Sequence, residues 1–149
     1  VDLNLNQNIK MDSNVLNLTE FRWNPFESTI YGMYHGTVYI DSDYYLIGTD
    51  DQGNKICYQE TGRNGQETMF RQTIGLYPGY EEISPEANTI TLQLYEVKND
   101  TAHQVSEEKM DKDSSDDIYE ESTTYVYDGG ESPIDSAIPI GDNLTIQIR

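Results

Sequence analysis

The stretch Asn88-Thr-Ile-Thr-Leu-Gln-Leu-Tyr-Glu-Val97 decides the fold class of this chain. Apolar side chains stand at every second position, at Ile90, Leu92 and Leu94, with polar or amphipathic ones between them. Successive side chains of a β-strand point to opposite faces of its sheet. The alternation therefore predicts a half-buried strand over Ile90–Val97.

The same pattern recurs along the chain, and no helical apolar stripe of comparable length accompanies it. Alternating runs bounded by turn residues predict further strands over residues 8–11, 15–23, 28–37, 44–49, 55–60, 67–74, 122–128 and 143–149. Seven to nine short strands separated by turns indicate an all-β, antiparallel β-sandwich. A short barrel uses the same alternation and stays open as an alternative.

The strand over Val15–Trp23 carries a specific expectation about its two faces. Strict alternation places Leu16 and Leu18 on one face and Phe21 and Trp23 on the other. Trp23, next to Phe21, is interpreted as a core residue.

The size and charge of the chain limit its class. Its 149 residues are a common size for one domain, so we expect a single domain over residues 1–149. Acids outnumber bases by 27 to 9, which gives a net charge of -18. Nucleic-acid binding normally needs a basic patch, and the nine cationic side chains are scattered, so nucleic acid is excluded as a partner.

Cys57 is the single cysteine, so an intrachain disulfide is impossible. This fits a cytosolic protein, or an exported protein from a lineage that avoids cysteine. A nucleophilic thiol would need a positioned histidine, and none is nearby, so Cys57 is interpreted as a semi-buried packing residue. No apolar run approaches the length of a membrane span, so we expect no membrane contact by these residues.

Two acidic segments invite a metal-site interpretation. In Asp50-Asp51-Gln52-Gly53-Asn54, hairpin-turn chemistry accounts for every residue, because Asx side chains cap their own backbone and glycine permits positive φ. Glu107–Glu121 contains eight acidic residues and two lysines, too polar to offset its ordering entropy, and predicts a long mobile loop. Its Asp111-x-Asp113-x-x-Asp116-Asp117 run lacks the glycine and the terminal glutamate spacing of a calcium loop, so a solvated loop is favoured over a calcium site.

No catalytic constellation emerges from the sequence. The pairs Glu81-Glu82 and Glu120-Glu121 are chain neighbours, and in an extended chain their side chains diverge and cannot converge on one sugar. His35 and His103, the only imidazoles, are interpreted as a strand residue and a loop residue. We therefore expect no catalytic residues, no cofactor-binding residues and no metal ligands, and no enzymatic activity.

The twelve tyrosines and Trp23 raise the possibility of carbohydrate binding, because sugars stack on exposed aromatic rings. Tyr44-Tyr45 and the pair Tyr31 and Tyr34 place rings on both faces of their strands. This arrangement favours general packing over one flat platform.

One longer pattern resembles a known family. Asn17-Leu-Thr-Glu-Phe-Arg-Trp-Asn-Pro-Phe-Glu-Ser-Thr-Ile-Tyr31 is similar to the opening strands of a Gram-positive family of single-pass membrane proteins related to extracytoplasmic sigma-factor regulators. The hairpin over Tyr45–Tyr58 and the stretch Tyr80–Leu92 extend the resemblance. It implies an immunoglobulin-like domain outside the cytoplasmic membrane, tethered by a helix that lies outside these 149 residues, and it transfers no functional residue.

These observations favour a non-enzymatic, extracytoplasmic domain of a membrane-anchored bacterial surface protein, engaged in signalling or protein interaction. Its expected partner is a protein, either its own upstream domain or an envelope component, with strand addition at a sheet edge as one route. A carbohydrate-binding or adhesin module is the alternative, and a small β-sheet enzyme would need convergent ionisable groups in a pocket.

Overall fold

The computed structural model describes residues 1–36, 42–98 and 133–149. Its strands are β1 (Asp2–Lys10), β2 (Asn14–Asn24), β3 (Glu27–Gly36), β4 (Ser42–Asp50), β5 (Lys55–Asn64), β6 (Glu67–Gln72), β7 (Thr89–Lys98) and β8 (Ile138–Gln147). A short 3-10 helix, η1 (Pro133–Ser136), precedes β8 and is the one helix of the described residues. The all-β class predicted from the alternation is confirmed.

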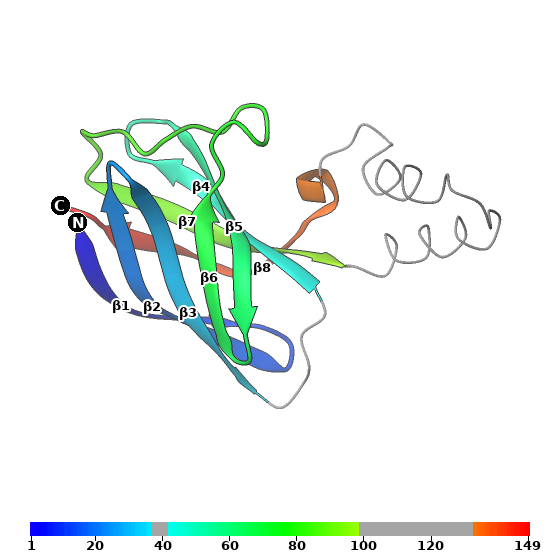
Figure 1. Ribbon diagram of the computed structural model, residues 1–149. Helices are drawn as coiled ribbons and strands as arrows, with labels where there is room; N and C mark the ends of the chain where they lie inside the picture. Colours follow the sequence, from blue (N-terminus) through cyan, green and yellow to red (C-terminus); the bar gives the residue numbers. More distant parts are fainter. Residues whose placement is uncertain (37–41, 99–132) are drawn as a thin grey trace, which may run out of the picture.

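All eight strands form one antiparallel sheet in the order β1-β2-β3-β6-β5-β4-β7-β8. Hairpins join β4, β5 and β6, while β3 returns beside β6 and β7 returns beside β4, so the order contains two overlapping Greek keys. The sheet curls until its first and last strands, β1 and β8, contact each other (Figure 1). The result is nearly barrel-shaped.

The division into two packed layers is not confirmed, because the described strands belong to a single sheet. Alternation fixes which side chains face the interior, but it does not determine whether opposite walls are separate sheets or parts of one curled sheet. The expected strand over 122–128 and the acidic segment Glu107–Glu121 lie outside the described residues.

The first and last strands are longer than the sequence predicted. β1 begins at Asp2 instead of residue 8, because half-buried Leu3 and Leu5 pack against the core from its first half. β8 begins at Ile138 instead of residue 143 and pairs with β7 along most of its length.

The core is a single cluster inside the curled sheet, and β7 shows how alternation builds it. Ile90, Leu92 and Leu94 are fully buried, as predicted, while the residues between them are half-exposed. Fully buried side chains from other strands complete the cluster, among them Leu16, Ile30, Leu46, Ile56, Tyr58 and Phe70. Each such side chain contributes about 2 kcal/mol by leaving water.

A bulge in β2 corrects the predicted division of its faces. The β2–β3 register shifts between Leu18 and Glu20, so β2 gains one residue relative to β3. An extra residue reverses the facing of everything beyond it. Leu16, Leu18 and Phe21 are therefore all fully buried in the same core, and Trp23 packs against it half-buried.

The connection over residues 73–88 adds Ile83 and Ala87 to the core cluster and covers part of the outside of the sheet. Tyr77 from this connection contacts Tyr45 of β4, with ring centroids 6.2 Å apart, and the Thr73 hydroxyl donates to the Cys57 carbonyl over 3.2 Å. Tyr45 and Cys57 lie outside the core cluster yet are buried, because this connection covers them. The prediction of a packing role for Cys57 is consistent with this burial.

Candidate functional site

A cavity of about 940 Å3 opens at one end of the curled sheet, where the β2–β3 turn, the end of β6 and the 73–88 connection meet. We call it the Phe26 cavity. Its lining combines aromatic, aliphatic and charged residues: Val1, Trp23, Asn24, Pro25, Phe26, Glu27, Ser28, Thr29, Arg71, Gln72, Ile74, Glu82, Ile83, Pro85 and Arg149.

The rim of the Phe26 cavity is apolar and exposed. Phe26 is 97% exposed at the β2–β3 turn, and Ile74 is 53% exposed on the facing connection. Leu76, two residues further along, is 59% exposed. The Phe26 backbone N–H donates to the Asn24 side-chain oxygen over 2.8 Å, so the turn that presents Phe26 is held in one conformation.

The floor of the cavity contains one unusual polar atom. The Ser28 and Tyr58 hydroxyls share a hydrogen bond of 2.6 Å, and burial raises the pKa of Tyr58 far above its usual value. Thr29, the next residue, is 1% exposed, and its Oγ1 is the one buried side-chain polar atom of the described residues without a hydrogen-bond partner. Buried polar groups are normally satisfied, so this atom requires an explanation.

Of the cations in the described residues, Arg22 and Arg63 form ion pairs, and Lys10, Lys55, Arg71, Lys98 and Arg149 form none. Arg22 forms ion pairs with Glu20 and Asp2, and Arg63 pairs with Glu60. Arg71 and Arg149, the two arginines that line the Phe26 cavity, form no ion pair with any described residue. Two glutamates, Glu27 and Glu82, line the same cavity.

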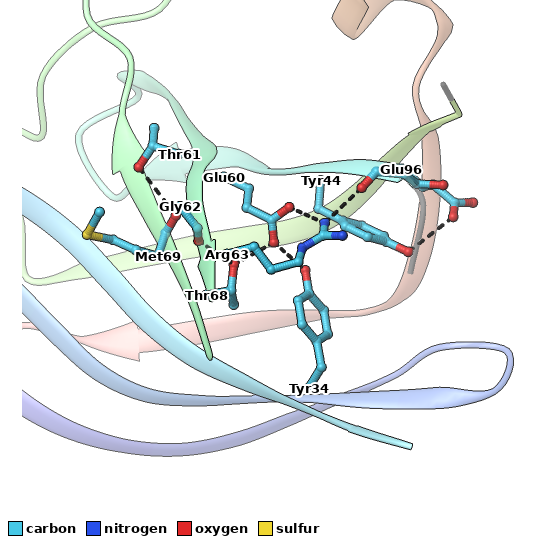
Figure 2. Close-up of polar contacts among 10 residues, drawn as sticks. Tyr34, Tyr44, Glu60, Thr61, Gly62, Arg63, Thr68, Met69 and Glu96 are labelled. Carbon is cyan, nitrogen blue, oxygen red and sulfur yellow. Dashed lines mark hydrogen bonds and ion pairs between the residues drawn. The ribbon is translucent and has the colours of Figure 1, made fainter. Parts of the chain in front are cut away.

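The opposite end of the sheet has a second cavity of about 930 Å3, between the β1–β2 turn and the start of β8. Beside it lies a polar cluster that links five strands, which we call the Arg63 cluster (Figure 2). Its members are Tyr34, Tyr44, Glu60, Arg63, Thr68 and Glu96. Tyr44 and Glu96 also line the second cavity.

Glu60 is the centre of the Arg63 cluster. Its Oε2 accepts hydrogen bonds of 2.5 Å from both the Tyr34 and the Thr68 hydroxyls, and its Oε1 pairs with the Arg63 guanidinium (Figure 2). The Glu60 side chain is only 6% exposed. These three donors occupy most of the acceptor sites of the carboxylate, so Glu60 links β5 to β3 and β6.

Two tyrosines enclose the Arg63 guanidinium. Its Cζ lies 5.3 Å from the Tyr34 ring centroid and 5.8 Å from that of Tyr44, within cation–π range. Burial first, and then the charge and hydrogen bond of Glu60, raise the pKa of Tyr34 well above its usual value. The same order of causes, with Glu96 in place of Glu60, raises the pKa of Tyr44.

The Asp50–Asn54 loop is a turn, as its chemistry predicted. Oδ1 of Asp50 accepts the backbone N–H groups of Gln52 and Asn54, and Oδ2 accepts that of Ser84, each over 2.9 Å. Gly53 has φ +90°. Burial raises the pKa of Asp50, but the three backbone donors outweigh burial and lower it overall. Asp50 therefore ties this turn to the 73–88 connection.

The other residues considered from the sequence do not converge. Glu81 and Glu82 are exposed on the 73–88 connection, and His35 is exposed near the end of β3. Tyr34 and Tyr44 face the core, whereas Tyr45 is buried under the connection and Tyr31 is half-buried beneath Arg22, so the prediction of rings on both faces is confirmed. His103, Glu120-Glu121 and the Asp111–Asp117 run lie outside the described residues.

Sequence reasoning missed the Phe26 cavity. The Asn24-Pro25-Phe26 turn offered one usable signal, because an aromatic residue after proline in a tight turn cannot reach the core. Arg71 and Arg149 are 78 positions apart in the chain, and nothing local to either one indicates that they meet. Only the curl of the sheet brings them to one cavity.

In the part of the chain that is described, no group of three or more His, Cys, Asp or Glu side chains could hold a metal ion. The single short helix there falls well below the length and hydropathy of a membrane-crossing segment. A scan against protein-family models, a search of curated proteins and a search of solved structures each find no match to this chain.

Proposed function

We propose that this chain is a non-enzymatic binding domain of a membrane-anchored bacterial surface protein, and that it docks a protein partner through the rim of the Phe26 cavity. The observation that carries the proposal is the 97% exposure of Phe26 on a turn fixed by Asn24. Exposed apolar side chains that gather at a concave site mark interaction surfaces, and buried aromatic anchors dominate protein interfaces.

The surroundings of Phe26 support docking. Ile74 and Leu76 are two more of the five large apolar side chains that are exposed among the described residues, and both lie on the connection beside the cavity. A concave, partly apolar site with a few polar groups fits a protruding side chain of a partner.

The absence of enzymatic activity is part of the proposal, and the bonding of the acids supports it. Glu60 and Asp50, the two most buried carboxylates described, each accept three donors that hold strands or loops together. A general acid or base needs a lone pair or proton directed at a substrate.

The surface location and the membrane tether rest on the resemblance of Asn17–Tyr31 and Tyr80–Leu92 to the Gram-positive membrane-protein family. The finer proposal of an immunoglobulin-like domain rests on the same resemblance. It is also supported by the Greek-key order, a connection that immunoglobulin-like domains use.

Site-specific photo-crosslinking in cells tests the docking surface. A benzoylphenylalanine replaces Phe26 in the full-length protein, and in a matched control it replaces Ile138, which is 53% exposed and lines the opposite cavity. We expect a discrete adduct of protein size at position 26 and none at position 138. Adducts of equal yield at both positions, or none at position 26, would refute the docking surface.

Carbohydrate binding is the second candidate, and the lining of the same cavity favours it. Trp23 is half-buried there beside the planar polar side chains of Asn24 and Gln72, which suits stacking and hydrogen bonding to a sugar ring. A glycan array with Phe26→Ala as the matched variant separates the two candidates. A glycan signal that is lost in the variant supports a sugar ligand. A blank array with folded protein rules out carbohydrate binding.

A further inference from the structure

Two arginines line the Phe26 cavity in a chain where acids outnumber bases by 27 to 9. In such a chain each arginine has many possible carboxylate partners. Arg22 pairs with Glu20, and Arg63 pairs with Glu60. Arg71 and Arg149 form no ion pair with a described residue, although Glu27 and Glu82 line the same cavity. Their guanidinium groups are left available at this end of the sheet.

The two glutamates of the cavity do not pair with the guanidinium groups of Arg71 and Arg149. Glu27 is half-buried and accepts the Tyr31 hydroxyl over 3.3 Å, so its charge is already engaged. Two arginines against two glutamates make the cavity far less negative than the chain as a whole. A ligand carboxylate therefore meets less repulsion here than the net charge of the chain implies.

Arg71 also stands next to the unsatisfied hydroxyl. Thr29 on β3 and Arg71 on β6 are directly opposite each other in the antiparallel register, and such pairs place their side chains on the same face about 5 Å apart. The residue with the one unpartnered buried polar atom and a residue with an unpaired guanidinium are thus cross-strand neighbours.

From these observations we infer that the Phe26 cavity recognises an acidic side chain of the partner protein, placed next to an apolar residue that packs on Phe26 and Ile74. Arg71 binds the carboxylate, and Arg149 adds a second positive charge. The inference rests on the proposed function and makes it specific: the docked segment presents an apolar residue followed by Asp or Glu. An arginine fork binds a carboxylate through two parallel hydrogen bonds, which an amide cannot match.

Two blocked dipeptides, acetyl-Leu-Glu-amide and acetyl-Leu-Gln-amide, test this assignment with the whole 149-residue chain. Proton–nitrogen NMR spectra follow the Arg71 Nε signal and the Trp23 indole signal during titration. We expect the glutamate dipeptide to shift both signals and to bind about fivefold more tightly than the glutamine dipeptide. Arg71→Gln should abolish that difference, and its chemical-shift map shows whether the fold is kept.

A matched control variant is Lys98→Gln, which removes one positive charge from the lining of the opposite cavity. We expect it to keep the preference for glutamate, and added salt to reduce that preference in the unmodified chain. Equal binding of the two dipeptides, absence of shifts at the cavity, or an unchanged preference in Arg71→Gln would overturn the acidic-segment assignment. Shifts caused by free glucuronate, with none caused by either dipeptide, would overturn it in favour of an acidic sugar.

The two proposals fail in different ways. A crosslink at position 26 without discrimination between the dipeptides leaves the docking surface standing and removes the acidic subsite. Absence of the crosslink removes the docking surface itself.

Discussion

The carboxylate of Glu60 pairs with the guanidinium of Arg63 three residues further along β5, and water reaches little of either group. Their side chains are 6% and 24% exposed. The pair lies where β5 faces the ends of β3 and β4, since the rings of Tyr34 and Tyr44 enclose the guanidinium. Through these ring contacts the ion pair connects β5 to β3 and β4.

Replacement of Arg63 by Gln should destabilise the fold, because it leaves the Glu60 charge shielded from water without its ionic partner. We expect the free energy of unfolding in urea to fall by about 2 kcal/mol. Arg22→Gln is the matched control: its ion pair is more exposed than that of Arg63, so the loss should be clearly smaller. Equal losses in the two variants would show that the Arg63 cluster does not stabilise the sheet.

Gly48 should tolerate no side chain. An added Cβ would lie 1.7 Å from the Thr91 carbonyl oxygen of β7, a backbone atom that cannot move without breaking the β4–β7 pairing. We expect Gly48→Ala to cost more than about 3 kcal/mol or to prevent folding. Gly62→Ala, whose nearest neighbour is Met69 Cε at 3.6 Å, should change stability by less than about 0.5 kcal/mol in the same denaturation experiment.

Asp50 should give the fold a pH dependence in the acid range. Its folded pKa lies below the ordinary value of 3.8, so the unfolded state binds the proton more readily. Its contribution is therefore complete above the unfolded pKa and is lost as the pH falls through the folded pKa. We expect Asp50→Asn to flatten the profile of unfolding free energy below pH 3.8 relative to that of the unmodified chain.

Alkaline titration should separate the tyrosines into two groups. Burial raises the pKa values of Tyr34, Tyr44 and Tyr58 above the ordinary 10.0. The neutral phenols therefore stabilise the fold below pH 10.0, and this stabilisation declines as the pH rises further. We expect phenolate absorbance to rise in two steps, the second one coinciding with loss of the far-ultraviolet strand signal. A single step before unfolding would contradict their burial.

The fold class could be predicted because alternation is a local property. Ile90, Leu92 and Leu94 occupy the core as the sequence indicated. The faces of β2 could not be predicted, because the bulge near Thr19 depends on the register with β3 and leaves no local signature. Closure into a near-barrel depends on pairings between distant strands, which alternation does not encode.

The candidate site was less predictable than the fold for the same reason. The turn chemistry of Asp50 is local, and it was predicted and confirmed. The Arg63 cluster and the Phe26 cavity are assembled from side chains on strands far apart in the sequence. Phe26 alone carried a local sign of its exposure, since it follows a proline in a tight turn.

The strand order has a consequence for how quickly the chain reaches its native state. β1–β3 and β4–β6 can each form from neighbouring hairpins, but the two groups join where β3 pairs with β6, from Thr29–Arg71 to Met33–Glu67. Bringing such distant positions together lowers the entropy of the chain before the new contacts stabilise it. Folding should therefore take milliseconds or longer. We expect the pairing of β3 with β6 to limit the folding rate. In an Ile30→Val variant, most of the lost stability should then appear as slower refolding and little of it as faster unfolding.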